Sequence, residues 1–148
     1  MKYNDDDKRV KEITLKNAAH LDEFRKDLKE AGVDKKTVRN YINHADDYLE
    51  NYLAKQELLE MAEGASGFHI DAYMGDFLIR QSLLASEDIT LTVADSIKAF
   101  YSCMLQRGLI EKDAYENVVT TIEEFSPEWK AKLDLFQGTG RLDPFAFL

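Results

Sequence analysis

Apolar residues spaced three and four positions apart recur along most of the chain and predict a series of helices. The first helix covers residues 15–31, and Gly32 suits the left-handed residue that follows a helix end. Its apolar positions are Leu21, Phe24 and Leu28. The second helix covers residues 34–53, with Asp34 as its N-cap. Its apolar stripe is wide enough to face a core and consists of Val38, Tyr41, Ile42, Ala45, Tyr48, Leu49 and Tyr52.

A third helix is predicted over residues 68–84, after a short helical turn and a loop with two glycines between residues 56 and 67. Gly75 lies inside the apolar stripe of this helix, where glycine is unfavourable, so we expect another helix to cross closely there. The stripe consists of Ile70, Tyr73, Met74, Phe77 and Leu78.

A fourth helix is predicted over residues 91–107, with Thr90 or Asp88 as its cap and Gly108 as its stop. Its buried face consists of Val93, Ile97, Phe100, Tyr101 and Met104. Two shorter helices should follow, the second of them starting with Ser126 as cap and Pro127 in the first turn. The apolar positions of these two helices are Ala114, Tyr115, Val118, Val119, Ile122, Trp129, Leu133 and Phe136.

Strand-like alternation is absent from the sequence, so the fold class that we predict is all-α, a single bundle of five or six helices over residues 13–137. Residues 1–12 lack apolar periodicity and are expected to form a mobile tail. Residues 138–148 form an apolar C-terminal tail. We expect Phe145, Phe147 and Leu148 in this tail to dock on the domain or on a second copy of the chain.

Composition narrows the class of protein further. With 45% hydrophobic residues and few prolines and glycines, the chain should be compact and globular. Apolar stretches are too short to span a bilayer and the first residues do not resemble a signal peptide, so we expect a cytoplasmic protein with no membrane partner. Cys103 is the one cysteine, and its apolar neighbours on a helix predict a buried thiol.

The chain carries a formal net charge of −9, which repels phosphate at long range. Its first 60 residues hold 12 of the 19 basic residues beside 14 acidic ones, so a patch for nucleic acid is favoured in this half. Lys35, Lys36 and Arg39 lie at a helix start whose amides could hold a backbone phosphate, and Lys98 is a further candidate. Lys98 is equally well explained by an ion pair with Asp95, three residues earlier.

Two segments resemble the N-terminal core-binding domain of the tyrosine recombinases, the SAM-like domain of phage integrases. The first segment matches at Lys36, Thr37, Val38, Arg39 and Tyr41. The second matches at residues 96–101, which read Ser-Ile-Lys-Ala-Phe-Tyr, and its helix ends at Gly108. The chain as a whole looks more like a set of small stand-alone recombinase-like proteins that lack the catalytic domain. This resemblance implies a SAM-like helical bundle, with a C-terminal helical addition here, and it does not imply a reaction.

The sequence contains few residues arranged in a pattern typical of a catalytic site. Recombinases cut DNA with a separate C-terminal domain that contains a His-x-x-Arg pair, and none of the three histidines here begins that motif. The chain also lacks the paired histidine or cysteine spacing of strong metal sites and the glycine-rich loop that binds nucleotides. We therefore expect no enzyme activity, no metal and no cofactor.

Two functions remain open from the sequence. One is a non-catalytic, recombinase-like module in which Lys35, Lys36, Arg39 and Lys98 contact a DNA backbone weakly. The alternative is a protein-interaction or oligomerisation module with no nucleic-acid binding, which the acidic second half and the apolar tail favour. Clustering of Lys35, Lys36, Arg39 and Lys98 on one face would favour nucleic-acid binding, whereas their dispersal would rule it out.

Overall fold

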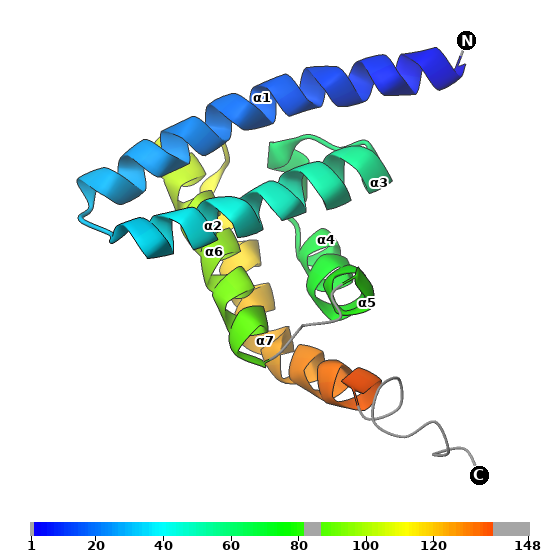
Figure 1. Ribbon diagram of the computed structural model, residues 1–148, viewed down its shortest axis with the longest axis vertical. Helices are drawn as coiled ribbons and strands as arrows, with labels where there is room; N and C mark the ends of the chain where they lie inside the picture. The colour runs from blue at the N-terminus through cyan, green and yellow to red at the C-terminus, as the bar shows by residue number, and fades with distance from the viewer. Residues whose placement is uncertain (1, 82–86, 138–148) are drawn as a thin grey trace.

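The computed structural model describes residues 2–81 and 87–137, and its regular secondary structure there is entirely helical (Figure 1). The all-α prediction is therefore confirmed. Three long helices are α1 (Lys2–Glu30), α6 (Glu87–Gln106) and α7 (Lys112–Gln137). A fourth runs without a break through α2 (Lys35–Asp46), the π-helical η1 (Asp47–Ala54) and α3 (Lys55–Glu57). A fifth runs through α4 (Gly67–Ala72), the π-helical η3 (Tyr73–Phe77) and α5 (Leu78–Gln81).

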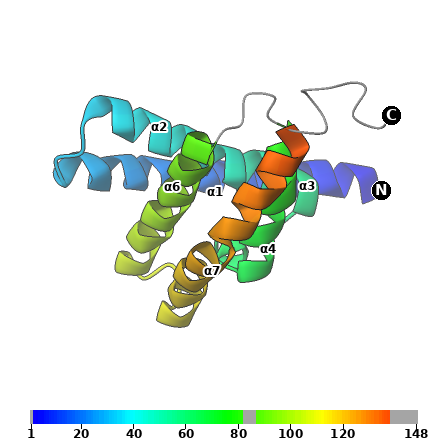
Figure 2. The same cartoon turned by 90° about the horizontal axis from the view of Figure 1, so that it is seen from below.

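These helices form two crossed groups. Helices α1 and α2 lie side by side, and α6 and α7 cross them at a steep angle (Figures 1 and 2). Helix α6 packs against α1, α2 and α7, while α4 packs against α7. In the described part of the chain, no helix is long and apolar enough to cross a membrane.

A tight turn joins α1 to α2, as the sequence predicts. Gly32 adopts the left-handed conformation with φ of +80°, and the amide of Val33 donates to the carbonyl of Leu28 at 3.1 Å, which closes the end of α1. The carboxylate of Asp34 then accepts a hydrogen bond from the amide of Thr37 at 2.9 Å and caps α2. The C-terminal end of α1 consequently lies beside the N-terminal end of α2.

Helix α1 begins far earlier than predicted, because residues 2–12 are helical rather than a separate tail. Contacts with residues distant in sequence explain why the helix begins so early. Arg9 and Lys16 both pair with Glu60, at 2.9 and 2.8 Å, and Ile13 is buried. Each of these partly or fully exposed ion pairs contributes little on its own, so the buried Ile13 and the continuous helix behind it supply most of the anchoring.

Buried tyrosines dominate the centre of the core, and each hydroxyl has a hydrogen-bond acceptor. Tyr48 donates to the carbonyl of Gly64 at 2.7 Å, and Tyr101 donates to the carbonyl of Met61 at 2.8 Å. Both carbonyls belong to the short 3-10 helix η2 (Met61–Gly64), the helical turn predicted before the glycine loop. This pairing removes the cost of burying the hydroxyl groups and fixes η2 under the core.

Helix α7 is one continuous helix, so the prediction of two shorter helices with a start at Ser126 is wrong. Pro127 lies inside it, and the hydroxyl of Ser126 turns back to the carbonyl of Ile122 instead of capping a new helix. Packing on both sides of the proline explains the continuity. Val118 before it and Trp129 after it are fully buried.

The indole of Trp129 donates to Asp71 at 2.7 Å and packs against Gly75, which confirms the close helix crossing.

Helix α6 includes Glu87, so neither Asp88 nor Thr90 is its cap. Its predicted buried face is confirmed, with each of the five residues at most 1% exposed. Gly108, with φ of +74°, follows its C-terminal end as predicted. The thiol of Cys103 is buried, as expected, and donates to the carboxylate of Asp27 at 2.6 Å.

Candidate nucleic-acid interface

Four basic residues surround one hollow at the turn between α1 and α2, where the two helices converge in Figure 1. Arg25 and Lys29 come from α1, and Lys35 and Arg39 come from α2. In each helix the two residues are four positions apart and therefore share a face. The tight turn brings the two faces together around a cavity of about 280 Å³, which we call the basic groove.

The basic groove has an apolar floor and an exposed charged rim. Val33 and Val38 line its base, and Val38 is only 5% exposed. All four cationic side chains are exposed, so they can extend toward a ligand. At the rim, Arg25 forms a weak ion pair with Asp22 at 3.7 Å. The groove therefore concentrates positive charge on a chain of net charge −9, which is the local patch that phosphate binding requires.

The N-terminal amides of α2 are less available than the sequence suggested. Asp34 accepts hydrogen bonds from both the amide and the hydroxyl of Thr37, each at 2.9 Å. These bonds hold the pKa of Asp34 below its usual value, so the cap stays ionised at neutral pH. A carboxylate thus occupies the place where a phosphate would meet the helix end. Anion binding here must come from the side chains of the groove.

Of the four residues predicted from the sequence, Lys35 and Arg39 line the basic groove. Lys36 is exposed on α2 beside it, and its side chain is not part of the lining. Lys98 is exposed on α6, whereas the described lining of the groove comes from α1, the turn and α2. Within the described ranges, Lys98 and Asp95 form no ion pair at 4.0 Å or less, so the predicted pairing is absent.

Sequence reasoning missed Arg25 and Lys29, because their helix was interpreted only for its apolar face. A signal was present. The two residues are four positions apart in the last two turns before Gly32, so a tight turn there must bring them beside the first turn of the next helix. A basic pair on each side of a helical hairpin turn is therefore a recognisable pattern.

A second hollow lies between the same two helices, toward the middle of α1. Its lining includes the carboxylates of Asp46 and Glu50 and also Lys55, and its nearest α1 residue, Leu21, is four positions or about 6 Å along the helix from Arg25. Burial and the neighbouring carboxylates of Glu50 and Asp47 raise the pKa of Asp46. The basic groove at the turn is therefore followed along α1 by a hollow whose lining carries charges of both signs.

One further cation lies between α1 and α6 and is already neutralised. Arg107 pairs with Asp27 at 2.8 Å and with Glu23 at 3.7 Å. Burial and the hydrogen bond to Asp27 raise the pKa of Cys103 to about 12, so this thiol stays protonated at neutral pH.

In the part of the chain that the structure describes, no three His, Cys, Asp or Glu side chains form a group that could hold a metal ion.

Comparisons with models of protein families, with curated proteins and with solved structures find no match to this chain. The predicted docking tail, with Phe145, Phe147 and Leu148, lies outside the described residues.

Proposed function

We propose that the protein is a non-catalytic helical module, similar to the SAM-like arm of the tyrosine recombinases, that contacts a nucleic-acid backbone weakly through the basic groove. One observation carries the proposal. Lys35 and Arg39, expected from the sequence to contact phosphate, are joined by Arg25 and Lys29 around a single hollow. Four flexible cations without a fixed hydrogen-bonding frame suit phosphate oxygens rather than base edges, so binding should be independent of sequence.

The affinity should be low for two reasons. The net charge of −9 opposes the approach of any polyanion, and the carboxylate of Asp34 lies next to Lys35 in the chain. A dissociation constant in the range of about 10⁻⁴ to 10⁻⁶ M, typical of non-specific binding, is therefore expected.

Binding of a labelled 20-base-pair duplex, followed by fluorescence anisotropy at about 50 mM salt, tests the proposal. Arg39→Ala and Lys29→Ala should each weaken binding several-fold, and by similar factors for duplexes of different sequence. Lys98→Ala shows whether α6 takes part. Lys112→Ala is the matched control, because Lys112 is exposed on α7 and pairs with Glu116 away from the groove. Undetectable binding, or equal losses in groove and control variants, would reject the proposal.

The alternative is a protein-interaction or oligomerisation module with no nucleic-acid binding. Exposed apolar side chains favour it, notably Phe68, which is 76% exposed on α4 and packs edge-on against His69. Under this alternative, Phe68→Ser would shift the sedimentation of the protein or of its complexes, and the groove variants would change nothing.

A further inference from the structure

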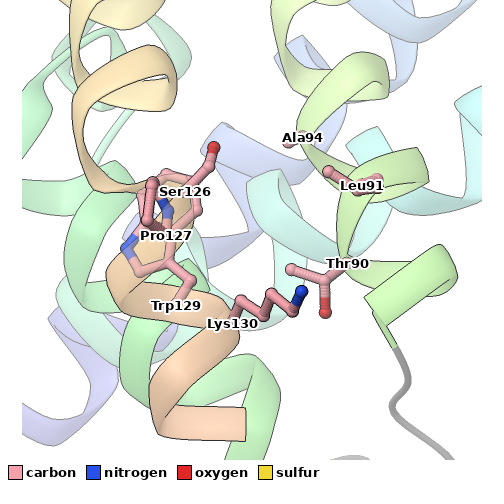
Figure 3. Close-up of a pocket in the computed structure, with 7 residues that line it drawn as sticks. All are labelled: Thr90, Leu91, Ala94, Ser126, Pro127, Trp129 and Lys130. Atoms are coloured by element: carbon pink, nitrogen blue, oxygen red, sulfur yellow. The ribbon is translucent and has the colours of Figure 1, made fainter. Parts of the chain in front are cut away.

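Two other hollows differ from the basic groove in charge. The hollow between α6 and α7 has a largely apolar lining, in which Lys130 is the one charged residue among those described (Figure 3). The hollow lined by Asp46 and Glu50 also contains Lys55, so its charges are mixed. The basic groove, by contrast, gathers four positive side chains and no negative one among the described residues that line it.

Three of the four groove cations lack a counter-charge. Within the described ranges, Lys29, Lys35 and Arg39 form no ion pair at 4.0 Å or less. Several lysines and arginines on other surfaces do pair with carboxylates, at 2.8–2.9 Å. Like charges gathered in this way repel one another, and a bound anion relieves the repulsion. The groove is therefore complementary to an anion with more than one negative charge.

The four cations also form a compact group. The two cations of each helix lie four residues apart, or about 6 Å along the axis, and packed helices lie about 8–10 Å apart. The groove between them has a volume of about 280 Å³, which is room for one small group rather than for several nucleotides. Four successive phosphates on one strand of a duplex, each with one negative charge, extend over about 10 Å of the helix axis. A single group with two negative charges matches the groove better than such a row.

We propose that the basic groove binds the terminal phosphomonoester of a nucleic-acid strand in preference to internal phosphodiesters, an inference that rests on the proposed function. As in a phosphorylated side chain, such a group carries a charge of about −1.5 to −2 at pH 7 and presents three acceptor oxygens. Two groove cations share it, and the other two meet the adjoining diester groups. The sugar of the end nucleotide lies against Val33 and Val38, because unstacking costs least where a base is poorly paired, as at a strand end.

Duplexes that differ only at their ends test this preference. Each carries its fluorescent label at an internal base and ends in hydroxyl groups, in 5′-phosphates or in 3′-phosphates. In fluorescence anisotropy at about 50 mM salt, at least one phosphorylated duplex should bind about three- to tenfold more tightly than the hydroxyl-ended duplex, since two weak ion pairs are added. The comparison of 5′- and 3′-phosphates shows which end of the strand enters the groove.

Two further ligands separate charge from the rest of the group. A duplex whose terminal phosphate is capped as a methyl ester keeps one negative charge, so its affinity should lie between those of the hydroxyl-ended and the phosphorylated duplex. Inorganic phosphate, added at constant ionic strength, should displace the duplex poorly, because it lacks the sugar that contacts the apolar floor.

Neighbouring lysines of α2 provide a variant and its matched control. Lys35→Ala removes a charge from the lining of the groove and should lower the preference for the phosphorylated end by about two- to threefold. Lys36→Ala removes the same charge from the next residue, which is exposed outside the lining, and should leave the preference unchanged. The preference is a ratio of two affinities, so a general loss of positive charge does not alter it.

The outcomes distinguish this inference from the proposed function. Equal binding of the hydroxyl-ended and phosphorylated duplexes would overturn the inference, and nucleic-acid binding would stand if the groove variants still weakened both duplexes. A preference that falls equally in Lys35→Ala and Lys36→Ala would also overturn it, as would displacement by inorganic phosphate at the concentration of the duplex. If no duplex binds at all, both proposals are wrong.

Discussion

Among the glycines that the structure describes, Gly64 should be the least replaceable, because η2 lies directly against two buried side chains. A Cβ atom at this position would meet Cδ1 of Leu53 and would lie 2.7 Å from Oη of Tyr101. Neither side chain can move aside easily. Leu53 and Tyr101 are fully buried, and the hydroxyl of Tyr101 is held by the carbonyl of Met61 at 2.8 Å.

The cost of Gly64→Ala follows from these contacts. Overpacking a well-packed core costs about 1–3 kcal/mol, and displacing a buried hydroxyl from its acceptor costs about 1–3 kcal/mol more. The reduced entropy of the unfolded chain returns about 0.4–1 kcal/mol. We therefore expect the free energy of unfolding to fall by about 1–6 kcal/mol, with a central value of about 3 kcal/mol. In urea unfolding followed by circular dichroism, the midpoint should fall by about 1–2 M.

Gly32→Ala is the control for backbone conformation. Gly32 has φ of +80° and no atom within 4 Å of a Cβ placed there, so its replacement costs only the left-handed strain of about 1–2 kcal/mol. If Gly64→Ala destabilises the protein by less than Gly32→Ala, the packing of η2 against Leu53 and Tyr101 is not as described.

Three further predictions concern single residues. Asp34→Asn keeps an N-cap and removes the negative charge beside the groove. Duplex affinity should therefore rise about two- to threefold at low salt, and this gain should fade as the salt concentration increases. An unchanged affinity would show that Asp34 does not lie at the binding surface. Pro127→Ala should raise the free energy of unfolding, measured in urea, by about 1–3 kcal/mol. The reason is that alanine supplies the backbone amide that the exposed proline lacks inside α7. A lower free energy of unfolding would show that the proline is needed for packing. Cys103, with a pKa of about 12, should react with iodoacetamide at pH 8 far more slowly in the folded than in the urea-unfolded protein. Because the unfolded thiol ionises at lower pH than the folded one, its contribution to stability should decline as the pH rises from about 9 toward 12, and Cys103→Ser should lessen that decline.

Local signals in the sequence predicted much of the helical framework. The Asp34 cap, the left-handed positions of Gly32 and Gly108 and the buried stripe of α6 all depend on residues within a few positions of one another. Gly75 carried information about a contact distant in sequence. A glycine inside an apolar stripe indicated that another helix crosses there, and the fold shows that this helix is the one that contains Trp129.

The failures share a physical cause, since each depends on partners distant in sequence. The early start of α1 depends mainly on the burial of Ile13 against the rest of the fold, and the ion pairs from Arg9 and Lys16 to Glu60, about 50 positions away, add a smaller contribution. The continuity of α7 through Pro127 depends on packing against α4 and η3, which local proline rules do not include.

The candidate site was only half predictable for the same reason. Lys35 and Arg39 are evident from their helix start, but the cavity exists because the turn places Arg25 and Lys29 opposite them. The sequence suggested that the N-terminal amides of α2 could bind a phosphate. This expectation was incomplete, because Asp34, which marks the start of the helix, itself accepts hydrogen bonds from the amide and the hydroxyl of Thr37.

The salt dependence of duplex binding tests the central claim most directly. If each of the four groove cations neutralises one phosphate, the logarithm of the binding constant should fall against the logarithm of the salt concentration with a slope of about −3.6. Affinity should then decrease about a hundredfold between about 50 and 200 mM salt. Arg25→Ala and Arg39→Ala should each make the slope shallower by about 0.9, and Lys112→Ala should leave it unchanged. A slope near zero, or a slope that neither groove substitution alters, would contradict the assignment of the basic groove as a nucleic-acid interface.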